Sequence, residues 1–100
     1  MTCFVYVVGI GGDDGPWRGP VKIGVAQNVE QRLEGMRPHS PLPLAAVASF
    51  ELESRIAALR LERAVHEHFR EDNLDHEWFA VDPAAAVEAV ALLHQQGGGR

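Results

Sequence analysis

The sequence has few of the features that mark secreted or membrane proteins. Its single cysteine, Cys3, cannot form a disulfide within the chain, and the apolar run around it is typical of a small buried side chain. No basic start precedes the apolar stretch 4–10, which is too short for a secretion signal. No stretch has the length of a membrane span. We therefore expect a cytoplasmic protein.

Positive charge is also scarce. The chain has nine Lys and Arg residues against fourteen Asp and Glu residues, a net charge of -5. Residues 1–50 are balanced, with four charges of each sign, so the whole deficit lies in residues 51–100. A net acidic chain is a poor stand-alone ligand for nucleic acid, but the balanced half leaves a polyanion room to approach. The charge weakens a DNA hypothesis without excluding it.

The length and apolar content predict one small domain. One hundred residues, 46% of them hydrophobic, suffice for a single modest core. There is no internal repeat and no domain boundary. We predict one domain over residues 1–96 and a flexible tail at 97–100, where three glycines precede the last arginine.

The residue pattern predicts an α+β fold. We expect extended segments at 4–8, 21–25, 44–50 and 77–81, and helices at 28–36, 53–70 and 84–95. A glycine-rich loop joins the first two strands, which should form an antiparallel hairpin. Asn28 followed by Gln31 resembles a capping box, and Asp82-Pro83 is typical of an N-cap and first-turn proline.

Glu62 is conspicuous in the long helix because most of the side chains on the same helical face are apolar. With about 100° per residue, the side chains within about 60° of it are those of Ala58, Leu59, Val65, His66 and Phe69. An ionised carboxylate inside an apolar stripe is costly unless it is paired or binds a metal. Two interpretations are open: a metal ligand, or an internal ion pair with Arg32.

The first half offers three further candidates. Arg32 lies beside the apolar stripe of the first helix, where it can bind a phosphate or extend its stem along the core. Tyr6 is either a half-buried strand tyrosine or a functional hydroxyl. Lys22 is either an exposed strand lysine or, if it lies near Tyr6, a cation that lowers the pKa of the phenol or contacts a phosphate.

His66 is the histidine with a spacing that suggests a site. It follows Glu62 by one helical turn, so the two side chains can share a metal, although two ligands are only half a site. We expect His68 and His76 at the surface or in loops, and His94 carries no functional signal. The pair Trp78-Phe79 is typical of core packing, with stacking on a base as the alternative.

The order of these motifs resembles the GIY-YIG nuclease superfamily over residues 4–81. The nearest likeness is to its compact phage-type or "meiotically up-regulated" branch. The segments that carry it are Val5-Tyr6-Val7-Val8 for GIY, Val21-Lys22-Ile23-Gly24 for YIG, the helix 28–33 with Arg32, Pro41-Leu42-Pro43-Leu44, the segment 61–69 with its Leu-Glu, His and Phe residues, and Glu77-Trp78-Phe79. Each segment is short, and their order and spacing together are specific.

The resemblance implies a small three-stranded antiparallel sheet flanked by about three helices. It also implies hydrolysis of DNA phosphodiester bonds with one divalent cation, Mg²⁺ or Mn²⁺. Glu62 would hold the metal, Arg32 would stabilise the transition state, and Tyr6 would act as the general base or help to position it. His66 is typical of the branch. DNA is the expected partner.

Two departures from the family motifs concern activity. Phe4-Val5 replaces the glycine and isoleucine before Tyr6, and Lys22 replaces the YIG tyrosine. A cation beside Tyr6 would favour the phenolate. Three hypotheses follow: an active endonuclease, a nucleic-acid-binding module with weak or lost catalysis, and a protein-interaction domain in which Glu62 and Arg32 form an ion pair.

Overall fold

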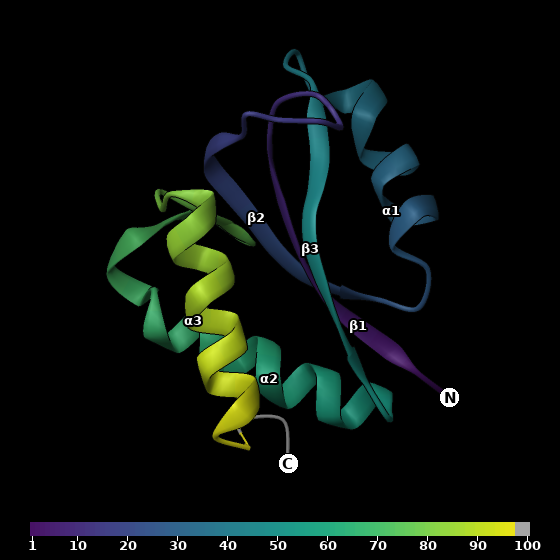
Figure 1. Ribbon diagram of the computed structural model, residues 1–100, viewed down its shortest axis with the longest axis vertical. Helices are drawn as coiled ribbons and strands as arrows, with labels where there is room; N and C mark the ends of the chain where they lie inside the picture. Colours follow the sequence, from purple (N-terminus) through teal and green to yellow (C-terminus); the bar gives the residue numbers. More distant parts are fainter. Residues whose placement is uncertain (98–100) are drawn as a thin grey trace.

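The computed structural model of the protein describes residues 1–97, which form an antiparallel sheet with helices on both faces (Figure 1). The strands are β1 (Cys3–Ile10), β2 (Arg18–Ala26), β3 (Leu44–Leu52), β4 (Asn73–Asp75) and β5 (Trp78–Phe79). The helices are α1 (Val29–Met36), α2 (Arg55–His68) and α3 (Pro83–Gln95), with short 3-10 turns at Arg37–His39 and Arg70–Asp72. The predicted α+β class is confirmed.

The sheet is wider than the resemblance implied. Within residues 1–97 its strand order is β3-β1-β2-β5-β4, and the expected three-stranded sheet is the part formed by β3, β1 and β2. The predicted hairpin is confirmed, with Tyr6 opposite Gly24 and Val8 opposite Lys22. The added hairpin of β4 and β5 pairs with β2 through Trp78 and Phe79. Strands of two and three residues are too short to show an alternating pattern.

The helix starts follow the predicted capping residues. The Asn28 side chain accepts a hydrogen bond from the Gln31 N–H at 3.0 Å, and the Asp82 side chain accepts one from Ala84 at 3.1 Å. The long helix α2 begins later than expected, because Ser54 is its N-cap and accepts from Ala57 at 3.1 Å. It also ends earlier, at His68.

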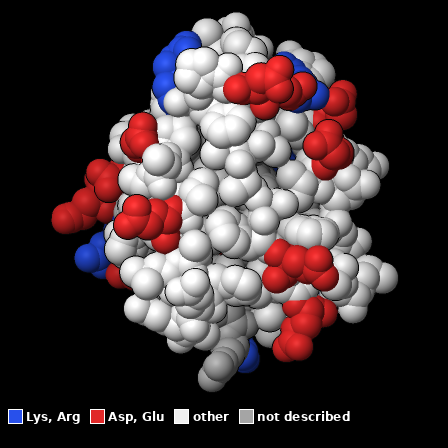
Figure 2. Space-filling view, viewed as in Figure 1, with Lys and Arg blue, Asp and Glu red and all other residues white. Residues whose placement is uncertain are grey.

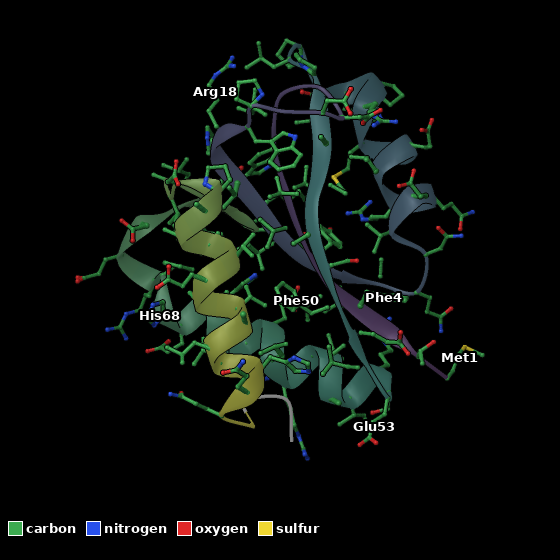
Figure 3. The ribbon with its side chains drawn as sticks, viewed as in Figure 1. Met1, Phe4, Arg18, Phe50, Glu53 and His68 are labelled. Atoms are coloured by element: carbon green, nitrogen blue, oxygen red, sulfur yellow. The ribbon has the colours of Figure 1, made fainter. Side chains whose placement is uncertain are left out.

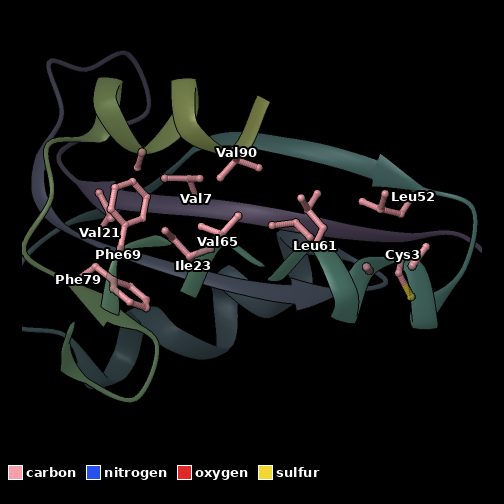
Figure 4. Close-up of a cluster of buried hydrophobic side chains, with 14 residues drawn as sticks. Cys3, Val7, Val21, Ile23, Leu52, Leu61, Val65, Phe69, Phe79 and Val90 are labelled. Carbon is pink, nitrogen blue, oxygen red and sulfur yellow. The ribbon is translucent and has the colours of Figure 1, made fainter. Parts of the chain in front are cut away.

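The two faces of the sheet carry separate cores. Helix α1 covers the face that bears Tyr6 and Val8, and α2 and α3 cover the other (Figure 1). The larger core lies under α2 and α3, and Figure 4 shows Val7 and Ile23 of the sheet among the side chains of Val65, Phe69 and Val90. Cys3 belongs to this core and is fully buried, as predicted.

The surface matches the acidic composition. Figure 2 shows acidic side chains scattered over the face that it views, with isolated basic side chains and no continuous basic patch. None of the helices in residues 1–97 has both the length and the apolar character needed to cross a membrane. Of the predicted flexible tail, residues 98–100 lie outside the described part of the chain.

Candidate active site at the open edge of strand β2

One half of strand β2 has no neighbour on its outer edge. Strand β5 pairs with β2 at Val21 and Lys22, and the Ile23 N–H donates to the Glu77 carbonyl at 3.0 Å. Beyond Ile23, no strand among the described residues covers this edge. A cleft of about 460 Å³ opens there, with walls from β2, from α1 and from Arg55 at the start of α2. Side chains from both helical layers can therefore meet at this edge.

Gly24 makes room for two polar side chains at the open edge. A Cβ atom on Gly24 would overlap the Tyr6 hydroxyl and lie 2.6 Å from Oε1 of Glu77. With no side chain there, the Tyr6 hydroxyl crosses β2 and donates to Glu77 Oε1 at 3.3 Å. The glycine of the Lys22-Ile23-Gly24 motif is thus required by the close approach of Tyr6 and Glu77.

Tyr6 is a neutral hydrogen-bond donor in this arrangement. Its side chain is 1% exposed. Burial, and next the Glu77 carboxylate, raise the pKa of Tyr6 to about 12, although the nearby Arg32 guanidinium acts in the opposite direction. The idea that Lys22 lowers this pKa is wrong. Lys22 lies opposite Val8, and its Nζ sits 5.9 Å from the centre of the Trp78 ring.

The titration of Tyr6 can be measured directly, because it is the only tyrosine. Its pKa is raised from the ordinary 10.0, so the stability that the neutral phenol contributes is complete below pH 10 and is lost as the pH rises towards 12. We expect the phenolate absorbance to appear near pH 12 in the folded protein and near pH 10 in urea. A native midpoint at or below 10 would contradict the buried position of Tyr6.

Glu62 lies at the border of the apolar stripe on α2. Leu61 and Val65 are fully buried, whereas Leu59 is 41% exposed. The stripe is therefore centred on Leu61, and the expectation that Glu62 lies inside it is wrong. Glu62 is half-buried, and burial raises the pKa of its carboxyl group, with Glu77 adding to the rise and His66 and Arg55 opposing it.

Glu62 and Arg32 do not form an ion pair. The ion pairs within residues 1–97 join Arg37 to Asp13 and Glu34, and Arg70 to Glu67, and the His76 ring contacts the Asp75 carboxylate. Arg32 is instead exposed on α1, where it lines the cleft together with Arg55. The ion-pair interpretation of Glu62 is therefore wrong, and the carboxylate is open to another partner.

His66 ties helix α2 to the edge strand. Its Nε2 lies 2.9 Å from the Ile23 carbonyl oxygen, which can only accept, so Nε2 donates the hydrogen bond. The ring also packs against Phe79, with 4.8 Å between ring centres. One imidazole nitrogen is thus used by the backbone of β2, and the contact fixes the position of Glu62, one turn away, relative to Gly24.

The donor groups at the edge suit a magnesium-type ion. Residues 1–97 contain no cluster of three or more His, Cys, Asp or Glu side chains arranged around one point, as structural zinc would require. The Glu77 carboxylate instead lies close enough to Glu62 to raise the pKa of the Glu62 carboxyl group, so two carboxylates face this edge. Mg²⁺ is commonly held by one or two carboxylates, with water and substrate phosphates completing its shell.

Four of the predicted site residues meet at this edge: Tyr6, Arg32, Glu62 and His66. Lys22 lies outside this group, with its side chain beside Trp78. Sequence reasoning missed Glu77 and Arg55. Glu77 was noted only as the first residue of the Glu77-Trp78-Phe79 segment that resembles the family. Its acidic side chain, at the start of a predicted extended segment, was a usable signal. His68 and His76 are exposed, as predicted.

The family model of the T5orf172 domain matches residues 3–94. No curated protein and no solved structure matches the chain significantly.

Proposed function

The chain belongs to the T5orf172 domain family, which is related to GIY-YIG domains, and from this premise we propose that it is a metal-dependent endonuclease that hydrolyses DNA phosphodiester bonds. The observation that carries the proposal is the meeting of Tyr6, Glu77 and Glu62 at an open strand edge beside two arginines. This combination offers carboxylates for a cation and guanidinium groups for a phosphate.

In this proposal Glu62 holds a divalent cation, Mg²⁺ or Mn²⁺, with Glu77 beside it. When bound, such an ion polarises the phosphate and makes water a better nucleophile. His66 keeps Glu62 in place through its hydrogen bond to Ile23. The raised pKa of Glu62 fits the role, because a nearby cation would restore the charged carboxylate that burial disfavours.

Arg32 is proposed to bind the phosphate and stabilise the charge that develops on it, and Arg55 lines the same cleft. Tyr6 takes the positioning role, because its pKa of about 12 keeps the phenol neutral. Glu77, which accepts the hydrogen bond from Tyr6, is then the group suited to take a proton from the attacking water. Lys22 supplies positive charge beside the cleft.

The family branch is part of the same proposal. The likeness of Pro41–Leu44 and of residues 61–69 and 77–79 to the compact phage-type or "meiotically up-regulated" branch supports membership of it. A single domain over residues 1–96 and a cytoplasmic location remain predictions.

A second candidate is a nucleic-acid-binding or protein-interaction module with weak or lost catalysis. The raised pKa of Tyr6 favours it if Tyr6, rather than Glu77, is the required general base, because a phenol that stays neutral cannot accept the proton. The net charge of -5 also limits how strongly the chain alone can hold DNA.

A DNA-cleavage assay with and without metal distinguishes the endonuclease from the module with weak or lost catalysis. Purified protein incubated with supercoiled plasmid and Mg²⁺ or Mn²⁺ should nick or linearise the DNA, and EDTA should stop the reaction. Nicking unaffected by EDTA would point to a contaminant. An intact plasmid under every metal condition would favour the binding module.

A further inference from the structure

A second cavity beside the cleft gathers basic side chains from three separate elements. It measures about 210 Å³ and is lined by Lys22 of β2, Arg32 of α1 and His39 of the following turn. Trp78 and Ser40 complete its polar and aromatic wall. These basic side chains come from the sheet and from the helical layer, so residues distant in the sequence meet at the cavity.

The charge in this cavity is uncompensated within residues 1–97. No acidic side chain lines it, and none forms an ion pair with Lys22, Arg32 or His39. Arg37, the next cation along the chain from α1, is by contrast bound by Glu34 at 2.6 Å and Asp13 at 3.3 Å. In a chain with excess acid, a set of basic groups that lacks acidic partners favours an anionic ligand.

The cavity also has an aromatic wall and a shared border with the cleft. Trp78 is partly buried beside Lys22, so its indole forms a fixed surface suited to a sugar or base. Arg32 and Gly35 line both the cavity and the cleft. One ligand that spans both openings would therefore pass Arg32.

We propose that this cavity is a second phosphate subsite, which binds the phosphate of the nucleotide adjacent to the one cleaved, with the nucleoside against Trp78. The assignment of DNA as the ligand rests on the proposed function. Lys22 and His39 donate to the phosphate, and Arg32 contacts the phosphates on both sides. The lysine at the YIG position thus has a binding role.

Thymidine 3′,5′-bisphosphate, which carries two phosphates on one nucleoside, tests this subsite without any cleavage. In calorimetry with EDTA present, it should bind about tenfold more tightly than either thymidine monophosphate. His39→Ala should remove this difference. His68→Ala is the control, because His68 is exposed at the end of α2 (Figure 3) and should leave the difference unchanged.

NMR provides the second readout. The bisphosphate should shift the indole N–H signal of Trp78 but not that of Trp17, which donates to the Gly12 carbonyl at 2.8 Å in the loop before β2. Equal affinity for bisphosphate and monophosphates, or an unmoved Trp78 signal, would overturn the subsite. Tight bisphosphate binding by a protein that cuts no plasmid would support the subsite and reject the nuclease, so the two proposals fail separately.

Discussion

The Glu62→Ala substitution is expected to reduce metal-dependent DNA cleavage by on the order of a hundredfold or more, because it removes the carboxylate proposed to hold the cation. The fold should survive the change. Glu62 is half-buried and forms no ion pair within residues 1–97, so its loss leaves no charged partner stranded. The measurement is the initial rate of plasmid nicking in Mg²⁺, with circular dichroism to compare thermal unfolding.

Glu67→Ala is the matched control for this experiment. Glu67 lies on the same helix, is exposed, and forms a surface ion pair with Arg70 at 2.9 Å. Such a pair contributes about 1 kcal/mol or less, so both rate and stability should stay near those of the wild type. Equal cleavage by Glu62→Ala and wild-type protein would show that the metal-binding role belongs to another residue.

The Gly24→Ala substitution is expected to impair both stability and cleavage. The added Cβ would overlap the Tyr6 hydroxyl and lie 2.6 Å from Glu77 Oε1, so both side chains must move. Overpacking of this kind costs about 1 to 3 kcal/mol. Because Tyr6 and Glu77 are part of the proposed site, the cleavage rate should fall by more than the loss of folded protein explains. Urea unfolding and nicking rates measure the two effects separately.

Gly12→Ala provides the comparison for the glycine substitution. Nothing lies within 4 Å of a Cβ placed on Gly12, in the loop between β1 and β2. Its stability and activity should therefore match those of the wild type. If Gly24→Ala behaves like Gly12→Ala in both assays, the close approach of Tyr6 and Glu77 across β2 has no functional importance.

Most of the fold could be predicted from the sequence, because strand and helix-cap patterns depend on residues that are close together in the chain. The β-branched and aromatic residues at 4–8 and the alternation at 21–25 predicted the hairpin, and Asn28 and Asp82 marked two helix starts that the structure confirms. Strand β5 lies within the extended segment predicted at 77–81, whereas β4, with three residues, is too short to show a pattern and was missed. The start of α2 was predicted too early, at residue 53, because Ser54 is the N-cap and the helix begins at Arg55.

The site could be predicted only in part, because its geometry depends on contacts between residues that are far apart in the sequence. Glu77 reaches Tyr6 across 71 positions of sequence, and no periodicity reports such a contact. Gly24, not Lys22, lies opposite Tyr6, and burial together with the Glu77 carboxylate raises the phenol pKa that a neighbouring lysine was expected to lower. The roles of Tyr6, Lys22, Arg32, Glu62 and His66 in catalysis remain predictions.

The most direct test of a metal site at the open edge of β2 is to locate a bound Mn²⁺ ion by paramagnetic broadening of amide NMR signals. We predict that the strongest broadening surrounds Glu62, Glu77 and Val25, and that Glu62→Ala removes it while Glu67→Ala leaves it intact. Strongest broadening at the acidic segment 71–75, or broadening around β2 that persists in Glu62→Ala, would contradict a metal-dependent site at the open edge of β2.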